Sequence, residues 1–460
     1  MTYRALAADL SLTSGFVPIA FQVVAAALLV WLLAGRRSRR WWVRWVPLAL
    51  VGGLALAGVA WWYADHQGWI DRPPPFSVWL WIGTAGLAAA LTVLGWREIG
   101  WEQRTAGLLA GAMALLCSAS SLNQWTQYLP TVNAAGARLT GAGPAGTIDL
   151  DQVNKLKQAG TRPDHGTLVE LTIPSTASGF DHRDEYVYLP PSWYDQRTAP
   201  LPVVVMVHAE FGGPDDWPVS AKAVETLDAF ASAHDGNAPV VVFVDIAGTF
   251  SNDTECVNGR RGMAADHITK DVVPFMISNF GVSQNAAQWG IAGWSSGGTC
   301  ALILTTKYPE LFKTFVDIDG QRGPYAGDRE QTVTRLFDGD EHAWGQFDPR
   351  TLMTRQPLDG ISGWFATSMD TPTVYRAPAP GAEADPPVID DDENVLNPGA
   401  TANYLCELGS NHGMECAVVS DPGVHSFQNA GDNFAKALPW LAGRLNTPGV
   451  TPIPLPAAQH

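Results

Sequence analysis

Positive charge is scarce in this sequence. The 460 residues include 29 Lys and Arg against 45 Asp and Glu, which gives a formal net charge of −16 at pH 7 with His neutral. The deficit lies after residue 130, where 20 basic residues face 40 acidic ones, whereas the first 130 residues carry nine basic and five acidic residues. Because nucleic acid binding needs a basic surface, we expect no nucleic acid partner.

Charge of either sign is missing from four long apolar stretches near the start of the chain, at roughly residues 15–34, 45–63, 76–95 and 105–122. Each is close to the ~20 residues that a helix needs to cross a bilayer. Tryptophans cluster near the ends of these stretches, where indole rings settle at membrane interfaces. No acidic residue or lysine lies inside them to suggest ion transport. The sequence therefore predicts a four-helix transmembrane anchor.

The loops between the apolar stretches predict their orientation. The first and third loops are basic, and the second, with Asp65 and Asp71 against Arg72, is not; the basic residues are Arg36, Arg37, Arg39, Arg40, Arg44, Arg97 and Arg104. Basic loops stay in the cytoplasm, so both termini and everything after residue 122 are expected outside. The first stretch is followed by too many others to be a cleaved signal peptide. We expect a multi-pass protein of the plasma membrane.

Cysteine is also scarce. Cys117 lies in the fourth apolar stretch, and the other four are Cys256, Cys300, Cys406 and Cys416. Their spacing matches no metal-binding motif, and we expect neither a metal nor another cofactor. Four cysteines in an oxidising compartment permit two disulfides with three possible connectivities. We favour Cys406–Cys416, which would join a predicted helix to the strand that follows it.

The chain after the anchor alternates between predicted strands and helices. We expect an anchor at 1–125, a Gly/Ala-rich linker at 126–165, one domain at 166–447 and a disordered tail at 448–460. Apolar, β-branched runs predict strands at 168–173, 184–189, 202–207, 239–246 and 288–292, and helices are predicted at 221–234, 263–280 and 296–308. This order is typical of a doubly wound α/β sheet.

A serine flanked by glycines lies where the last of these strands gives way to a helix. The segment GWSSGG, residues 293–298, contains the pattern G-x-S-x-G with Ser295 at its centre. A tight turn alone would also use glycines here. The strand before it and the helix after it favour the nucleophile elbow of α/β-hydrolases, in which a strained bend exposes the serine hydroxyl.

Four segments resemble the Putative esterase family of α/β-hydrolases, which includes esterase-D-like enzymes and the secreted mycolyltransferases of mycobacteria. They are DEYVYLPPSWYD (184–195), PVVVMVHAEFGG (202–213), the long run from ITKDVVPF to YPELF (268–312) and DPGVHSFQNA (421–430). The resemblance spans about residues 165–445 and does not cover the apolar segment. It implies an α/β-hydrolase domain that follows the four-helix transmembrane domain.

The resemblance implies a Ser-His-acid triad. Ser295 matches the nucleophile and His425 the base, since the histidine of this fold follows the last strand, here 416–420; His412 precedes that strand and fits less well. The acid should follow the strand at 363–367, where Asp370 lies. An insertion follows at 371–396 and leaves three alternatives open for the acid, namely Asp391, Asp392 and Glu393. These three residues are equally explained as part of a solvated acidic loop.

Backbone amides of two segments are expected to form the oxyanion hole. One is that of Ser296, and the other, from the segment HAEFGG, is that of Ala209 or Glu210. The carboxylate of Glu210 would be unfavourable there unless it points away, and His208 is better explained as capping a strand end. Asp317 and Asp319 follow the next strand. We expect them either to shape the acyl or acceptor pocket or to cap a turn. Residues 337–349, rich in aromatic and acidic residues, are interpreted as a lid or substrate wall.

These observations predict a membrane-anchored serine enzyme that acts on acyl esters of the cell envelope through an acyl-enzyme. The expected substrate is a lipid or an acyl glycan, because the domain is tethered beside lipid. Water as acceptor makes the protein an esterase, and a sugar hydroxyl makes it an acyltransferase. The alternative is a catalytically inactive scaffold or glycan-binding module with a hydrolase-like fold.

Overall fold

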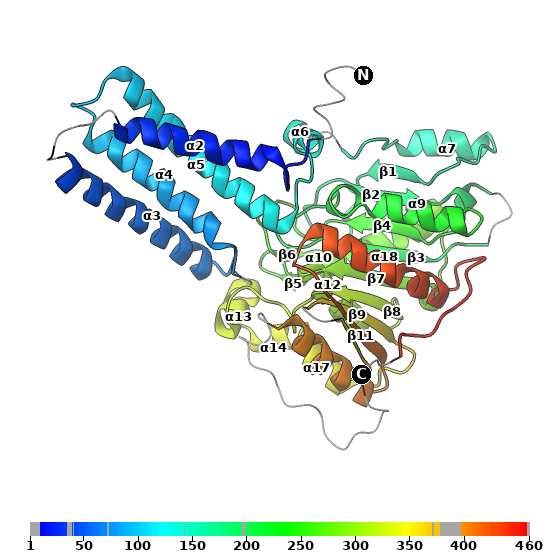
Figure 1. Ribbon diagram of the computed structural model, residues 1–460. Helices are drawn as coiled ribbons and strands as arrows, with labels where there is room; N and C mark the ends of the chain where they lie inside the picture. The colour runs from blue at the N-terminus through cyan, green and yellow to red at the C-terminus, as the bar shows by residue number, and fades with distance from the viewer. Residues whose placement is uncertain are drawn as a thin grey trace. The chain divides into compact units, whose positions relative to one another are not determined.

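The computed structural model describes residues 10–34, 39, 41–70, 73–141, 143–195, 199–369, 372–377 and 397–457. The chain divides into two compact units, Met1–Ala142 and Gly143–His460 (Figure 1).

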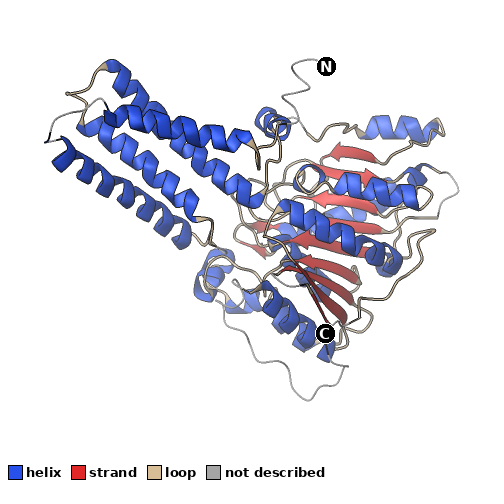
Figure 2. Ribbon diagram, in the orientation of Figure 1, coloured by secondary structure: helices blue, strands red, loops and turns tan. Residues whose placement is uncertain are grey.

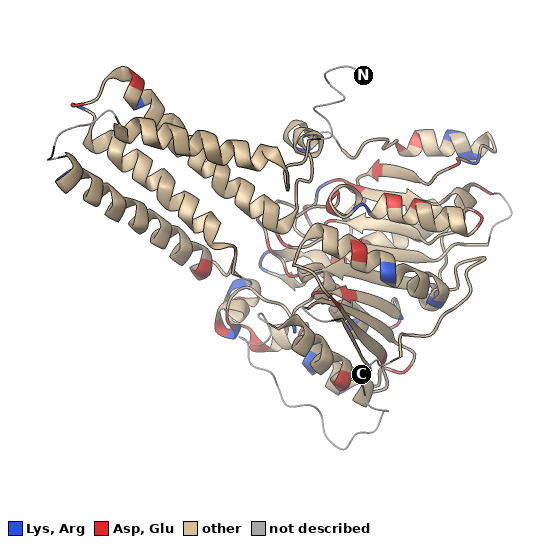
Figure 3. Ribbon diagram, viewed as in Figure 1, with Lys and Arg blue, Asp and Glu red and all other residues tan. Residues whose placement is uncertain are grey.

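Long apolar helices dominate the first unit. Its elements are α2 (Phe16–Ala34), η1 (Trp41–Trp45), α3 (Val46–His66), α4 (Phe76–Leu94), α5 (Trp101–Thr126) and the short α6 (Val132–Thr140). Four helical segments, with η1 and α3 continuous, have mean hydropathies of 2.4, 1.7, 1.7 and 1.6 and are long enough to cross a membrane. The charged residues of these helices lie near the helix ends (Figure 3). The four predicted apolar helices are confirmed, with ends that extend up to four residues further.

Glycines let these helices pack closely. A Cβ atom on Gly53 of α3 would lie 2.5 Å from the carbonyl oxygen of Gly83 in α4, and one on Gly107 of α5 would lie 1.9 Å from the Thr92 hydroxyl of α4. Small residues at such crossings allow backbones to approach in an apolar environment, where no hydrophobic effect drives helices together. Large side chains such as Leu54 and Phe76 are exposed on the outside of the unit, which suits contact with lipid tails.

A nine-stranded sheet organises the second unit, with strand order β1-β2-β4-β3-β7-β8-β9-β11-β10. The strands are β1 (Thr167–Leu171), β2 (Glu185–Leu189), β3 (Val203–Val207), β4 (Val240–Val244), β7 (Trp289–Trp294), β8 (Thr314–Ile318), β9 (Ser362–Ser368), β10 (Thr373–Tyr375) and β11 (Glu415–Asp421). From β4 to β11 all neighbours are parallel. β1, β2 and β10 pair antiparallel at the two edges. A separate two-stranded ribbon joins β5 (Asn258–Gly259) to β6 (Gly262–Met263).

Helices cover both faces of this sheet (Figure 2). α9 (Ala223–Ala233) and α18 (Phe427–Arg444) pack together on one face, and α12 (Ser296–Lys307), α15 (Pro349–Arg355) and α17 (Pro398–Asn411) pack together on the other. The remaining helices are α7 (Leu150–Gln158), η2 (Pro191–Tyr194), α8 (Asp216–Val219), α10 (Ala264–Asp266), η3 (His267–Val272), α11 (Val273–Phe280), η4 (Ala286–Gln288), α13 (Arg329–Phe337) and α14 (Glu341–Gly345). The predicted doubly wound α/β architecture is confirmed.

The central strands are apolar along their whole length because both of their faces are covered. Every residue of β3, β4 and β7 is buried, which is why these strands read as continuous apolar runs and not as alternating ones. Two disulfides lie in the same unit. Cys406–Cys416 joins α17 to β11, which confirms the favoured pairing, and Cys256–Cys300 joins the loop after β4 to α12. The segment interpreted as a linker contains α6 and α7.

Candidate active site

Ser295 occupies a strained bend between β7 and α12. Its φ of 56° and ψ of −126° lie in a region that L-residues rarely adopt. Its amide donates to the carbonyl of Ile318 at the end of β8. A Cβ atom on Gly293 would lie 2.2 Å from the carbonyl oxygen of Gly297, and one on Gly297 would lie 2.5 Å from that of Val207. The two motif glycines are therefore required by close backbone contacts, and the bend is the elbow that the motif predicts.

His425 lies beside the serine. It is in the loop between β11 and α18, and its Nε2 lies 3.2 Å from the Ser295 Oγ. Trp294, the residue before the serine, packs against the imidazole with a ring-centroid distance of 4.5 Å. It also packs edge-on against Phe427. The sequence predicted that Ser295 and His425 act as a pair. They are 130 residues apart in the chain, and the fold places them in contact. The contact of Trp294 was not anticipated.

The carboxylate beside His425 belongs to Asp319. Its Oδ2 lies 3.5 Å from His425 Nδ1, and the residue is 1 % exposed. The amide and hydroxyl of Ser368 in β9 both donate to this carboxylate. Asp319 has a φ of 50°, a conformation that Asp and Asn tolerate better than most residues. The acid beside the histidine thus follows β8, one strand before the position chosen from the sequence.

The four carboxylates that the sequence offered as the triad acid, Asp370, Asp391, Asp392 and Glu393, lie outside the described residues. The rival base His412 caps the end of α17 and precedes β11. His412 therefore lies near the amino ends of the parallel strands. Ser295 and His425 meet at the carboxyl ends.

A buried histidine directs the backbone of the loop after β3. The Nδ1 of His208 lies 2.7 Å from the carbonyl oxygen of Ala209, and its Nε2 lies 3.0 Å from Asp245 Oδ1. Because a carbonyl oxygen can only accept, Nδ1 carries a proton. In a trans peptide the C=O and the next N–H point in opposite directions. The amide of Glu210 accordingly points the other way, and it donates to the Ser296 Oγ at 2.8 Å.

Asp245 is ionised at this position. Its burial opposes ionisation, but hydrogen bonds from Arg183 and His208 outweigh that effect and hold the pKa of the carboxyl well below its usual range. His208 is therefore held by a permanent negative charge. His208 thus follows the end of β3, as predicted, and it also orients the peptide between Ala209 and Glu210.

Comparison with known proteins identifies the class of this domain. Residues 181–347 match the family described as Putative esterase. An uncharacterized protein of Corynebacterium glutamicum is 31% identical over 417 residues, which cover 87% of this chain and 90% of that protein. The chain belongs to the Putative esterase family. The matched range contains the elbow, the loop after β3 and Asp319, while His425 comes after it.

Several solved structures match part of this chain at low identity. A ferulic acid esterase matches with a TM-score of 0.46 and 12% identity, over 61% of this chain and 99% of that one. An S-formylglutathione hydrolase of Agrobacterium tumefaciens matches with a TM-score of 0.45 and 18% identity, over 62% of this chain and 97% of that one. The mycobacterial protein MPT51 matches with a TM-score of 0.38 and 17% identity, over 60% and 97%.

Asp317, the other buried carboxyl group at the end of β8, has a raised pKa. Burial raises the pKa of Asp317 to about 8, so the group is mainly protonated at neutral pH. Its Oδ1 accepts from the amide of Gly320 at 2.9 Å. Of the two roles expected for this residue, capping the turn after β8 is the one that these contacts support.

The carboxylate of Glu210 lies in an acidic cluster with Asp253 and Glu255 of the loop after β4. Ligand atoms of the three groups lie within 4.8 Å of one another, and Arg261 pairs with Asp253 at 2.8 Å. Burial and the charge of Asp253 raise the pKa of Glu255 well above its ordinary value. The raised pKa of Glu255 favours its neutral form, and this neutral form and the charge of Arg261 reduce the repulsion in this cluster.

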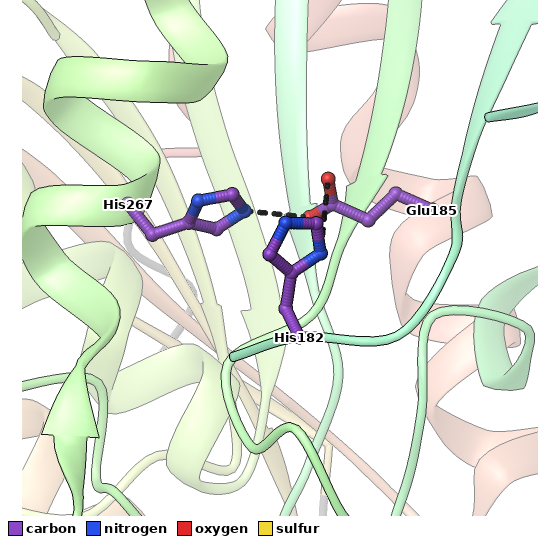
Figure 4. Close-up of side chains that lie close together, drawn as sticks. All are labelled: His182, Glu185 and His267. Carbon is purple, nitrogen blue, oxygen red and sulfur yellow. Dashed lines mark hydrogen bonds and ion pairs between the residues drawn. The ribbon is translucent and has the colours of Figure 1, made fainter. Parts of the chain in front are cut away.

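A second cluster of possible ligand atoms lies at the start of β2 (Figure 4). His182, Glu185 and His267 of η3 offer atoms within 4.8 Å of one another. Both ring nitrogens of His182 lie within hydrogen-bond distance of carbonyl oxygens, Nδ1 2.8 Å from Arg183 and Nε2 2.7 Å from Ile173. Both nitrogens of this ring are thus engaged with backbone oxygens, and neither is turned toward an open ligand position. Glu185 lies 3.2 Å from His267 Nε2, so these groups are explained by their contacts with one another.

The segment interpreted as a lid is anchored to the domain. Phe337 and Phe347 are buried and stack at a centroid distance of 6.1 Å. Lys307 at the end of α12 donates to the carbonyl of Gln346. These contacts favour a fixed wall over a hinged lid.

Proposed function

We propose that this protein is a membrane-anchored serine esterase or acyltransferase that acts on lipid or acyl-sugar esters of the cell envelope. The observation that carries the proposal is the line of three groups Ser295 Oγ, His425 and Asp319, with distances of 3.2 and 3.5 Å. A hydroxyl next to an imidazole that is in turn held by a carboxylate is the arrangement of a serine nucleophile.

In the proposed mechanism His425 Nε2 takes the proton of the Ser295 hydroxyl as its oxygen attacks the ester carbonyl. Asp319 stabilises the imidazolium that forms. The imidazolium then gives its proton to the leaving alcohol, and an acyl-enzyme remains on Ser295. Water or a sugar hydroxyl attacks this acyl group, His425 accepts the proton of the acceptor, and Ser295 leaves with that proton returned.

The surroundings of the site favour an apolar acyl group. Phe211 follows the Glu210 amide directly and packs against Phe250, with ring centroids 6.1 Å apart. Phe250 is 51% exposed, which gives the loop beside the nucleophile an apolar surface. Tethering by four apolar helices would keep the protein as a whole at a membrane, where lipid esters are found.

The expected compartment is the outer side of the plasma membrane. The basic first and third loops favour this orientation. Two disulfides in the second unit are consistent with an oxidising compartment.

Labelling by a fluorophosphonate probe tests the proposal. The full-length protein in detergent should label at Ser295 and hydrolyse short p-nitrophenyl esters. Ser295→Ala should lose both properties while its Tm stays near that of the parent. Ser362→Ala is the matched control, because Ser362 is a buried serine at the opposite end of the strands, and it should retain both. Absence of labelling in the folded parent would favour the inactive scaffold.

A further inference from the structure

The hydroxyl of Ser296 lies at the position where the oxyanion hole is expected. Ser296 is the first residue of α12, and its amide is one of the two donors that the elbow supplies. Its Oγ lies 2.8 Å from the amide nitrogen of Glu210, which with the amide of Ala209 is one of the two candidates for the second donor. The Ser296 hydroxyl therefore accepts from one of the amides that the oxyanion hole was expected to use.

This contact is fixed by the packing on both sides. His208 holds the carbonyl of Ala209 and so sets the direction of the Glu210 amide. On the other side, Gly297 brings the start of α12 against the end of β3, where a Cβ atom would meet the carbonyl oxygens of Val207 and His208 at 2.5 and 2.7 Å. The backbones of Glu210 and Ser296 are therefore both held in place, and in the observed side-chain position the Ser296 hydroxyl accepts from the Glu210 amide.

The proton of the Glu210 amide is consequently used before any substrate binds. An N–H group has one proton, and here it is given to the Ser296 Oγ. The hydroxyl still has its own proton to donate, and among the described residues no acceptor for it is found. Ser296 is 3 % exposed, so bulk water does not satisfy it. Buried hydroxyl groups normally find a partner, and the carbonyl oxygen of a bound ester would supply one.

We propose that the Ser296 hydroxyl is a catalytic group that donates the second hydrogen bond to the oxyanion of the tetrahedral intermediate. The Glu210 amide acts through it, because accepting a hydrogen bond polarises the hydroxyl and strengthens its donation. The hydroxyl keeps its proton throughout, so the acyl-transfer steps are unchanged. The second serine of GWSSGG thus has a role beside the nucleophile. This inference rests on the proposed function of Ser295.

Ser296→Ala tests the inference. Removing one oxyanion donor costs about 10²–10³ in kcat in a serine protease, and we expect a fall of about 10²-fold in kcat for p-nitrophenyl butyrate with KM changed little. The rate of labelling by a fluorophosphonate should fall in parallel, since the phosphonyl oxygen needs the same donors. Ser296→Cys keeps the volume of the side chain but offers only a weak S–H donor, and its kcat should fall to within about tenfold of that of Ser296→Ala. Ser362→Ala should match the parent.

Unchanged or faster reaction of the Ser296 variants would overturn the proposal. If Ser296→Ala and Ser296→Cys both fold, as judged by Tm, and react as fast as the parent or faster, the hydroxyl blocks the Glu210 amide and the proposal is overturned. Failure of the parent itself to label at Ser295 would instead remove the proposed function.

Discussion

Replacement of Asp319 by Asn is the change that most directly tests the triad. Asn has nearly the same shape as Asp and tolerates the φ of 50°, so the backbone is not strained by the substitution. The amide has no charge to stabilise the imidazolium of His425. The substitution removes the charge of the carboxylate, and it also replaces by an NH2 group one of the two oxygens that contact Ser368 and His425.

The expected loss follows from the geometry. Two unit charges 3.5 Å apart interact with about 5 kcal/mol at an effective dielectric constant of about 20, and each ~1.4 kcal/mol is a factor of ten in rate. We expect kcat to fall by about 10³-fold, close to the ~10⁴-fold measured for the corresponding change in a serine protease.

Asp317→Asn is the matched control. Asp317 lies two residues away, is equally buried and has a pKa of about 8, so it is mainly neutral at pH 7 and Asn mimics it. The variant should stay within about tenfold of the parent, because no charge is removed. Hydrolysis of p-nitrophenyl butyrate at pH 7, with Tm measured for each variant, gives the comparison.

Two further variants address the carboxylates that the sequence favoured. Asp370→Asn and the double change Asp391→Asn, Asp392→Asn should remain near parental activity if Asp319 is the acid. A hundredfold loss in Asp370→Asn, with Asp319→Asn close to the parent, would refute the assignment of Asp319 and restore the acid to the strand at 363–367. A loss confined to the double variant would give the role to the inserted segment.

Two other predictions concern the rest of the chain. In intact cells a protease or thiol reagent that cannot cross membranes should reach sites engineered after residue 122 but not those in the loop at 36–44, and the reverse pattern would overturn the orientation. The second prediction concerns His267, where burial disfavours the charged form but Glu185 and Asp271 outweigh it and raise the pKa. Its stabilisation is therefore complete below pH ~6.5 and is lost as the pH rises through the raised pKa. The Tm difference between the parent and His267→Gln should shrink from pH 6 to pH 9, and a constant difference would contradict this account.

The sequence alone determined the parts of this protein that depend on local patterns. Four apolar stretches of bilayer length predict four helices without any knowledge of the tertiary contacts, because the backbone hydrogen bonds of a helix are internal to each segment. The glycines around Ser295 predict the elbow because any side chain at Gly293 or Gly297 would collide with the backbone. His425 was found because this fold places its histidine after the last strand of the sheet.

Only the tertiary structure shows that the Asp319 carboxylate lies beside His425. β8 and β9 are parallel neighbours, with Ile318 opposite Ala366, so residues that follow either strand emerge at the same edge, separated by about 5 Å. Chain order cannot choose between two positions so close in space. The choice rests on the turn at Asp319 and on the bonds from Ser368, which no local pattern encodes.

The direction of the Glu210 amide was likewise beyond the reach of the sequence. It depends on one peptide plane, and that plane is set by His208, which is itself held by Asp245, 37 residues further along the chain. A pattern of residue types predicts that a loop lies near the nucleophile. Which way its N–H points is decided by hydrogen bonds between segments that meet only when the sheet has formed.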